Sequence, residues 1–253
     1  MRKSHYMGCL EPSAERIKTF PKAEKPSLSI SLATSVDLSS NFPSPGDQGN
    51  QGSCTAWAVA YAYKTFQEKL DQEWDLTTTD HQFSPAYVYN QINDGTDSGA
   101  YIDDAMKIIL DQGVCSLAVM PYSDTDYTTQ PTTSQKAAAS LYKSKSWGVL
   151  TAGSTTEIKT HLAAGDAVVV GIPVYADFDN LSSSNQVYDT ISGTLEGYHA
   201  LCLVGYNDSK SAFKFINSWG TSWGLNGYGY VSYNLLKNWS TIGYVMVDIT
   251  GES

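Results

Sequence analysis

The sequence predicts an α+β fold built from two lobes, the first mainly helical and the second mainly β. Helical periodicity is confined to the first half of the chain, whereas apolar and alternating runs of strand length fill the second half. Helices followed by strands are typical of α+β proteins. With 253 residues, of which 42 % are hydrophobic and 12 % aromatic, the chain is long enough to bury a substantial core.

The first predicted helix begins at Cys54, directly after a stretch rich in Pro, Gly and Asn, and Ser53 is its expected N-cap. Two shorter helices are expected over residues 84–93 and 100–112. Residues 121–135 lack periodicity and are rich in Thr, Ser, Asp and Pro, so we expect a loop there that crosses between the halves. Apolar side chains in the first helix recur at steps of three and four, which is typical of one buried face: Trp57, Ala58, Tyr61, Ala62, Phe66 and Leu70.

Strands are expected in the second half of the chain. Continuous apolar runs predict buried strands over residues 168–172 and 200–204. Alternating apolar and polar residues predict half-buried strands over 213–216 and 228–233. By strand alternation, the Cys202 side chain is expected on the opposite face from its two neighbours.

A short basic leader precedes the lobes. Residues 1–36 carry a net charge of +3 and hold both arginines of the chain, while the remainder carries −13. Two prolines and the Ser-rich run 27–35 mark the end of the leader as extended or flexible. Complementary charge would orient the leader along the acidic body, and a frayed terminus is the alternative. The expected lobes then cover residues 37–150 and 151–253.

Charge and hydropathy exclude several classes of protein. The net charge of −10 argues against a nucleic-acid binder. No apolar window is long enough for a transmembrane helix, and no secretory signal peptide is visible, so the compartment stays open between the cytoplasm and export by another route or with a signal already removed. Four cysteines form no zinc pattern and are too few for a disulfide scaffold, so no metal and mostly free thiols are expected: Cys9, Cys54, Cys115 and Cys202.

One cysteine and one histidine stand out as a candidate catalytic pair. Cys54 lies at the expected first turn of a helix, where the helix dipole and free N–H groups favour the nucleophilic thiolate; a small buried residue is the alternative reading. His199 opens an apolar strand 145 residues later, and Asn217 follows it by 18 residues. The other three histidines are expected to be solvated: His5, His81 and His161.

Three segments resemble the motifs of papain-like cysteine peptidases. The run 48–54 (QGNQGSC) is similar to the nucleophile motif, residues 198–206 to the histidine strand, and residues 217–228 to the asparagine motif. The motifs follow the family's order and come near its spacing, and weaker likeness extends from about residue 37 to the end. The resemblance implies a papain-like two-lobed fold with an antiparallel β-barrel-like second lobe and an active-site cleft between the lobes.

The resemblance also implies catalytic roles for four residues. Cys54 would be the nucleophile and His199 its base, which later acts as the acid toward the leaving amine. Asn217 would hold the imidazole in place, and Gln48 would donate to the oxyanion together with the backbone N–H of Cys54. Trp219 would cover the contact between the asparagine and the histidine.

Trp219 and five further residues would bind substrate. Gly99 and Ala100 match the family segment whose backbone pairs with an extended peptide. Tyr101, Ile102 and Ala200 would line the main specificity pocket, so we expect an apolar or aromatic residue at the second position before the cut. Ordinary core packing is the alternative reading for the first two of these three.

Two positions depart from the family pattern. Many relatives have a cysteine where Gln51 stands and a tryptophan where Thr55 stands. This indicates a disulfide-poor version that looks like the bacterial branch of the family. The disulfide state of the other cysteines is left open.

The function that the resemblance implies is that of a thiol peptidase. By default it is a monomeric endopeptidase that hydrolyses polypeptides through an acyl-enzyme, without metal or organic cofactor. The leader is shorter than the family's usual pro-segments. We expect the protein to be made as a zymogen whose activity the leader lowers until it is removed. The alternatives are an acyltransferase, deamidase or isopeptidase acting on one specific protein, and, disfavoured because all four catalytic residues are present, a non-catalytic binding module. The physiological substrate and any cleavage of the leader are left open.

Overall fold

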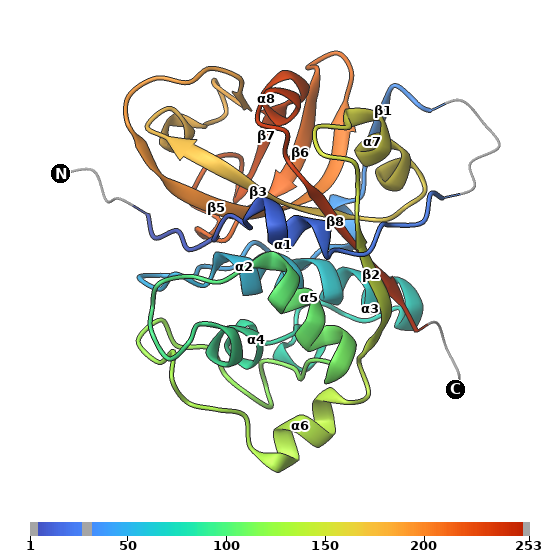
Figure 1. Ribbon diagram of the computed structural model, residues 1–253, viewed down its shortest axis with the longest axis vertical. Helices are drawn as coiled ribbons and strands as arrows, with labels where there is room; N and C mark the ends of the chain where they lie inside the picture. The colour runs from blue at the N-terminus through green and yellow to red at the C-terminus, as the bar shows by residue number, and fades with distance from the viewer. Residues whose placement is uncertain (1–4, 27–31, 250–253) are drawn as a thin grey trace.

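Residues 5–26 and 32–249 are described by the structure, a computed structural model, so part of the predicted Ser-rich boundary, residues 27–31, lies outside the described residues. The described chain forms two lobes, with the sheet in one and most of the helices in the other, as Figure 1 shows. The predicted α+β class is confirmed.

The helices are α1 (Ala14–Lys18), α2 (Cys54–Ala56), α3 (Thr65–Gln72), α4 (Pro85–Ile92), α5 (Ile102–Asp111), α6 (Thr133–Ala139), α7 (Thr155–Ala163) and α8 (Tyr233–Asn238), with shorter or wider helical turns η1 (Ser39–Asn41), η2 (Trp57–Lys64), η3 (Thr79–His81) and η4 (Phe178–Asn180). The strands are β1 (Ser35–Asp37), β2 (Ser144–Val149), β3 (Val168–Tyr175), β4 (Val187–Tyr188), β5 (Leu195–Asn207), β6 (Ala212–Ile216), β7 (Tyr228–Ser232) and β8 (Gly243–Asp248). None of the described helices is both long and apolar enough to cross a membrane.

The central helix runs without a break through α2, the π-helical segment η2 and α3. Every side chain from Cys54 to Phe66 is buried, so the helix is enclosed on all sides rather than along one stripe. Leu70, which the predicted stripe included, is 48 % exposed because the helix leaves the interior in its last turns. Ser53 does not cap the helix with its side chain, which instead bonds to the Tyr122 hydroxyl at 2.7 Å.

The remaining helices of the first half lie near their predicted places. Helices α4 and α5 fall within the expected ranges 84–93 and 100–112. The crossover loop is shorter than predicted, because α6 already begins at Thr133. Its start is fixed by a capping box, in which the Thr132 hydroxyl accepts from the Gln135 N–H and the Gln135 side chain accepts from the Thr132 N–H.

The sheet has the order β2-β8-β3-β5-β6-β7-β4, with β1 added beside β5. Its pairs are antiparallel except for the parallel pair of β4 and β7. No described pairing joins β2 to β4, so the sheet of the β lobe is open. Strand β7 ends at Ser232, and α8 follows directly because this serine caps it, a helix that the sequence pattern did not reveal.

Two apolar cores lie on the two faces of the long strand β5. Cys202 faces the core shared with the helical lobe, whereas Leu201 and Leu203 face the core that the sheet encloses with α7 and α8, in agreement with the predicted alternation. His161 of α7 is buried and not solvated as expected. Its Nδ1 lies 3.1 Å from Asp166 Oδ2, within hydrogen-bonding distance.

A buried ion pair ties the central helix to the last strand. Lys64 is fully buried, and its ammonium group pairs with Glu68 at 2.7 Å and with Asp248 of β8. The two carboxylates supply the partners that a buried ammonium group requires. The contact fixes the central helix, and therefore Cys54 at its start, against the sheet.

The leader lies between the two lobes. In Figure 1 its dark blue trace, including α1, crosses between the sheet and the helices α2 and α5. Near its start Cys9 forms a parallel bridge with Ala100, and near its end Lys22 forms one with Val149 of β2. The leader therefore occupies the interface where the sequence predicts the active site.

Candidate active site

Cys54 lies fully buried at the start of the central helix, facing strand β5. Its sulfur accepts a hydrogen bond from the Ala200 N–H at 3.4 Å. Because Ala200 directly follows His199, the fold brings the backbone beside the histidine to the thiol, although 145 residues separate the two side chains along the chain.

The contact between His199 and Asn217 fixes the tautomer of the imidazole. Asn217 Oδ1 accepts the Ser218 N–H at 2.8 Å and lies 2.7 Å from His199 Nε2. Because this oxygen can only accept, Nε2 must carry a proton and donate it. The other ring nitrogen, Nδ1, keeps its lone pair and is buried without a hydrogen-bond partner among the described residues. This nitrogen is the atom that can take a proton from a thiol.

Burial keeps both members of the pair neutral in this form of the protein. It raises the pKa of the Cys54 thiol to about 11, and the N–H groups of Ala200 and Gly8 that face the sulfur offset only part of this rise. Burial also lowers the pKa of His199 to about 4; the bond to Asn217 opposes this shift and the nearby His5 adds to it. A thiolate–imidazolium pair is therefore disfavoured while water is kept away.

Gln48 is held rigidly beside these residues. Its Nε2 donates to the Gln51 carbonyl at 2.7 Å, and its Oε1 accepts from the Ser218 hydroxyl at 2.6 Å. The backbone N–H of Gln48 also donates to the Ser218 carbonyl at 2.9 Å. The amide is thus fixed between the segment before Cys54 and the segment after Asn217. Among the described residues only Gln51 accepts from this amide, so its second N–H can donate to another group.

Trp219 lies between the candidate histidine and the leader. Its ring packs against His199, with the centroids 4.6 Å apart, and against His5, which stacks on it at 4.3 Å. The indole Nε1 donates to the Tyr6 carbonyl at 3.2 Å. Trp219 is itself buried and packs on the histidine that bonds to Asn217. His5 is therefore a packed residue here and not the solvated one that was expected.

The leader crosses the cleft as an added strand that bonds to both lobes. Leu10 donates its N–H to the Ala100 carbonyl at 3.0 Å, and the Ala100 N–H donates to the Gly8 carbonyl at 2.8 Å. On the other side, the Cys9 N–H donates to the Tyr198 carbonyl at 3.1 Å. The backbone edges of the two lobes, which are available to an extended peptide in principle, are thus filled by the chain's own N-terminal segment.

Two glycines permit this close approach. A Cβ atom on Gly8 would lie 1.9 Å from the Gly52 carbonyl oxygen, a distance that no packed atoms adopt. A Cβ atom on Gly99 would lie 2.3 Å from the Gly8 oxygen, and the φ of Gly99 is +95°, in the region that favours glycine. The leader and the body therefore fit at this point only because both lack side chains.

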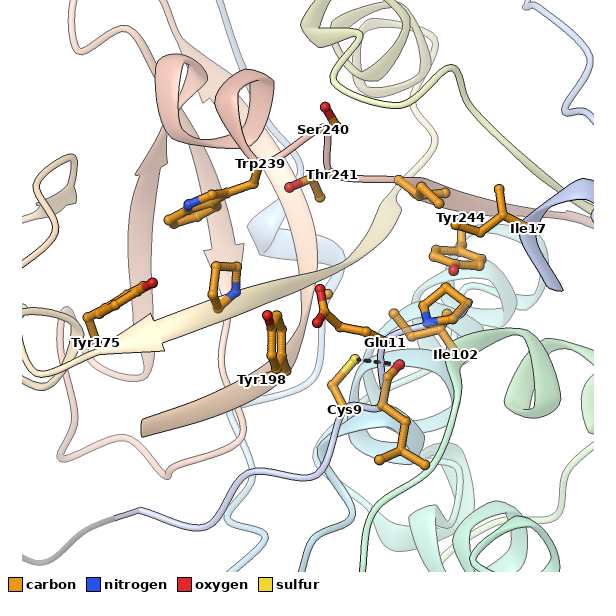
Figure 2. A pocket seen from close by; sticks show the side chains of 15 residues that line it. Cys9, Glu11, Ile17, Ile102, Tyr175, Tyr198, Trp239, Ser240, Thr241 and Tyr244 are labelled. Carbon is orange, nitrogen blue, oxygen red and sulfur yellow. Dashed lines mark hydrogen bonds between the residues drawn. The ribbon is translucent and has the colours of Figure 1, made fainter. Parts of the chain in front are cut away.

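A cavity of about 370 Å³ opens beside Cys9. In Figure 2 the Cys9 side chain lies between Tyr198 of β5 and Ile102 of α5, and aromatic rings line much of the wall. Of the three residues predicted to line the specificity pocket, only Ile102 borders this cavity. The Tyr101 ring instead lies under Arg16, and Ala200 contacts the Cys54 sulfur.

Other residues of the cavity wall were not anticipated: Gly171, Pro173, Tyr175, Trp239, Ile242 and Tyr244. They come from β3, from β8 and from the segment after α8. The strand β3 was predicted, but its place beside the histidine strand depends on sheet pairing, which spacing along the chain does not give. Pro173, which follows the predicted apolar run 168–172, is the sequence feature that could have indicated this part of the cavity wall.

At the two positions that depart from the family pattern, polar side chains form hydrogen bonds with nearby carbonyl groups. The Gln51 amide donates to the Ser123 carbonyl at 3.1 Å and to the Asp126 carbonyl at 3.3 Å, which holds the crossover loop against the nucleophile segment. The Thr55 hydroxyl donates to the Ala100 carbonyl at 3.1 Å. None of the four cysteines forms a disulfide, and within residues 5–26 and 32–249 no cluster of His, Cys, Asp and Glu could hold a metal ion.

Comparisons with known proteins agree with this arrangement. A family model described as papain family cysteine protease matches residues 32–246. The chain belongs to this family. It is therefore a cysteine protease, with the two-lobed α+β fold of the family.

Two relatives of this papain-family chain come from a mimivirus and from Giardia intestinalis. An uncharacterized peptidase C1-like protein of Acanthamoeba polyphaga mimivirus is 29 % identical over 223 residues, which cover 81 % of this chain and 70 % of the relative. The cathepsin B-like CP3 of Giardia intestinalis is 28 % identical over 74 % of this chain, and the match spans 63 % of its own length.

Solved papain-fold structures superpose closely. Xylellain, a cysteine protease from Xylella fastidiosa, matches with a TM-score of 0.82 and 26 % identity over 98 % of this chain and 99 % of its own. Procathepsin B S9 of Trypanosoma congolense matches with a TM-score of 0.74, 17 % identity and coverage of 96 % and 86 %, a likeness of fold alone.

Proposed function

We propose that the protein is an endopeptidase of the disulfide-poor, bacterial-type branch, made in a latent form that its leader inhibits. Cys54, His199, Asn217 and Gln48 carry out the reaction. The observation that carries the proposal is a pair of hydrogen bonds, from the Ala200 N–H to the Cys54 sulfur and from His199 Nε2 to Asn217. Together they gather the three motif segments at one buried point between the lobes. The likeness to xylellain over nearly the whole of both chains supports the assignment to this branch.

The proposed reaction is acyl transfer to the cysteine followed by hydrolysis. His199 Nδ1 takes the thiol proton, and the Cys54 thiolate attacks the carbonyl carbon of the scissile bond. The Gln48 side chain and the Cys54 backbone N–H donate to the resulting oxyanion. The imidazolium gives its proton to the leaving amine as the C–N bond breaks. A water molecule, deprotonated by His199, then cleaves the thioester and regenerates the thiol.

Asn217 suits this reaction because it orients the imidazole without adding charge. Its oxygen holds Nε2 in the protonated tautomer, which directs the basic Nδ1 toward proton transfer. Positive charge on the ring is then balanced by the thiolate, so no further anion is needed. The cover that Trp219 provides keeps water from competing for this contact.

The leader inhibits by occupying the cleft. The Gly8 N–H of the leader lies against the Cys54 sulfur, in the space that a substrate would need. The same segment fills the backbone partners at Ala100 and Tyr198 that an extended substrate would use. It also keeps water from both catalytic groups and so holds them neutral. Removal or displacement of residues 1–36 would release all three constraints, leaving residues 37–253 as the peptidase domain.

The substrate is a polypeptide bound in extended form. Once Cys9 leaves, the cavity beside Ile102 offers an apolar and aromatic wall to the residue at the second position before the cut. A hydrophobic or aromatic side chain gains most from entering such a cavity.

Labelling and turnover test the proposal directly. A chain beginning near Val36 should react with E-64, the inhibitor bound in a bromelain structure of the same fold, and should cleave peptides with an apolar second residue. The full chain should do both far more slowly. Cys54→Ala should abolish labelling and nearly all turnover, and Gln48→Ala should lower turnover by about 10²–10³. A loss below threefold in the Gln48 variant would remove that residue from the oxyanion site.

The same experiment separates the competing functions. An acyltransferase, deamidase or isopeptidase specific for one protein would be labelled by E-64 at Cys54 but would leave generic peptides intact. A non-catalytic binding module would show neither labelling nor turnover. Either result would overturn the proposed endopeptidase activity.

A further inference from the structure

An arginine of the leader is bound by the first turn of α5. Arg16 Nε lies 3.0 and 3.1 Å from the two carboxylate oxygens of Asp103, and its Nη2 donates to Asp103 Oδ2 at 2.8 Å. The same Nη2 pairs with Asp104 at 2.5 Å. The guanidinium carbon lies 4.0 Å from the centroid of the Tyr101 ring. We call the place formed by Tyr101, Asp103 and Asp104 the arginine site.

The arginine site is built for a planar cation rather than being a chance contact of surface charges. The Asp103 side chain is completely buried, and a buried carboxylate requires partners. Two donors of one guanidinium bind it in a forked arrangement, while the aromatic face binds the plane of the group. An ammonium group could not make the forked contact, so the site favours arginine over lysine.

The arginine site loses half of its counter-charge when the leader leaves. Two carboxylates then remain with one neighbouring ammonium, that of Lys107, which lies 2.8 Å from Asp103 and 3.4 Å from Asp104. Lys107 is 48 % exposed and pairs from the side of its own helix. The emptied arginine site therefore carries net negative charge and an open aromatic face.

We infer that the arginine site binds an arginine side chain of the polypeptide substrate after the leader has left. The inference rests on the proposed peptidase function. Its basis is position: Tyr101 directly follows Ala100, whose backbone pairs with an extended chain, and Ile102 of the apolar cavity lies between Tyr101 and Asp103. A substrate strand that pairs with Ala100 and fills the cavity passes beside the arginine site.

The geometry also gives the place of this arginine in the substrate. The apolar cavity receives the second residue before the cut, and successive residues of a strand are about 3.3 Å apart with side chains on alternate faces. Tyr101 and Asp103 flank Ile102 of the cavity at the start of α5, so the arginine site is next to the cavity. It therefore takes the third or fourth residue before the cut, so the preferred substrates combine an apolar residue with an arginine one or two residues upstream.

The test is cleavage of matched fluorogenic peptides by the chain that begins near Val36. The peptides share one apolar residue at the second position and carry Arg, Lys, Gln or Glu at the third or fourth. We expect kcat/KM for one of the Arg peptides to exceed that of its Gln counterpart by about tenfold, with Lys between them and Glu lowest. Asp104→Asn should reduce the Arg-to-Gln ratio below about threefold. Asp111→Asn, the same charge change at the exposed far end of α5, should leave the ratio unchanged.

A binding measurement supports the kinetic one. In the leader-free Cys54→Ala chain, a peptide of leader residues 5–26 should bind at least about tenfold more weakly when citrulline replaces Arg16, and the Asp104→Asn variant should show a smaller loss. Citrulline keeps the shape of arginine and removes its charge. Asp104 is 31 % exposed, so its substitution tests the arginine site without unburying the core residue Asp103.

The outcomes separate this inference from the function on which it rests. If peptides are cleaved but Arg and Gln are equivalent at both positions, or if Asp111→Asn lowers the ratio as much as Asp104→Asn does, the arginine site does not select substrate. If no peptide is cleaved and E-64 does not react, the peptidase function itself fails. In that case the binding measurement alone decides whether the arginine site recognises arginine.

Discussion

The two parts of the leader contact the body in different ways. Residues 5–10, the cleft segment, are held mainly through backbone hydrogen bonds and through the absence of side chains at Gly8 and Gly99. Residues 11–23, the anchor segment, are held by buried side chains in addition to the backbone bonds that join Pro21 and Ala23 to Val149 of β2. Arg16 enters the arginine site, and Phe20, which is 7 % exposed, packs against aromatic rings of β2 and β8.

This difference indicates a division of labour within one inhibitor. Backbone bonds are available to almost any peptide, so the cleft segment blocks the site without gaining much specificity. Buried side chains that fill particular places supply affinity and choice of partner. The anchor segment should therefore determine how tightly the leader binds, and the cleft segment should determine whether the bound leader inhibits.

The largest expected effect is that of Phe20→Ala on binding. Phe20 lies 5.7 Å from Trp147 and 5.9 Å from Tyr244, measured between ring centroids. Removing a buried phenylalanine costs about 3 kcal/mol or more, so the leader peptide 5–26 should bind the leader-free Cys54→Ala chain roughly 100-fold more weakly by calorimetry. Phe20→Leu, which keeps most of the volume, should lose less than tenfold. Equal losses of affinity for the two variants would mean that the Phe20 side chain does not pack against Trp147 and Tyr244 in solution.

Gly8→Val should weaken binding of the leader less than Phe20→Ala does, but it should remove nearly all of the inhibition. The new Cβ would overlap the Gly52 carbonyl, so residues 5–10 must leave the cleft while the anchor segment stays in place. We expect a loss of affinity of about 2 kcal/mol, or roughly 30-fold, because a terminal segment can swing away without disturbing the rest. The full chain carrying Gly8→Val should be nearly as active as the leader-free chain.

The control for Gly8→Val is Ala14→Val, which introduces the same valine side chain at an exposed leader position. It should leave both binding and inhibition unchanged. If Gly8→Val weakens binding more than Phe20→Ala does, or leaves the full chain inhibited, the division between blocking and anchoring is wrong.

The sequence predicted the candidate catalytic residues better than it predicted the path of the leader. The candidate catalytic residues lie in contiguous motifs whose chemistry is local: a cysteine at a helix start, and a histidine opening an apolar strand. The resemblance of these motifs to those of the family implied that the residues meet, and the hydrogen bonds bring their segments together. The charge of the leader likewise favoured contact with the acidic body, but its path through the cleft depends on the close fit of two glycines far apart in the chain, which no local pattern reveals.

Burial of polar residues was the other limit. His161 lies on a mixed polar helix and was expected to be solvated, yet Asp166 Oδ2 lies 3.1 Å from its Nδ1, and the Tyr63 hydroxyl donates to the same carboxylate at 2.6 Å. Tyr63 comes from the central helix, about a hundred residues earlier, so the partner that makes this burial tolerable is a tertiary one. Leu70 shows the converse, because an apolar residue in register with a buried stripe is exposed where the helix outruns the core.

Acid should weaken only the contact of the cleft segment. In the leader-bound form burial lowers the pKa of His199 to about 4, whereas a solvated imidazole titrates near 6.5. Below about pH 6.5 the leader-free protein therefore takes up a proton that the complex refuses, and acid favours release until the pH falls through about 4. Affinity of a leader peptide with His5→Phe, which removes the neighbouring imidazole, should fall roughly tenfold from pH 7.5 to pH 5.5 in the Cys54→Ala chain.

Two controls assign that change to His199. A peptide of residues 11–26 does not cover the histidine and should lose much less affinity over the same range. A His199→Gln chain should bind the longer peptide with an equally shallow pH dependence. A tenfold fall that persists in the His199→Gln chain would place the titrating group elsewhere, against the anchor segment. Acid would then act on the anchor segment rather than on the cleft segment.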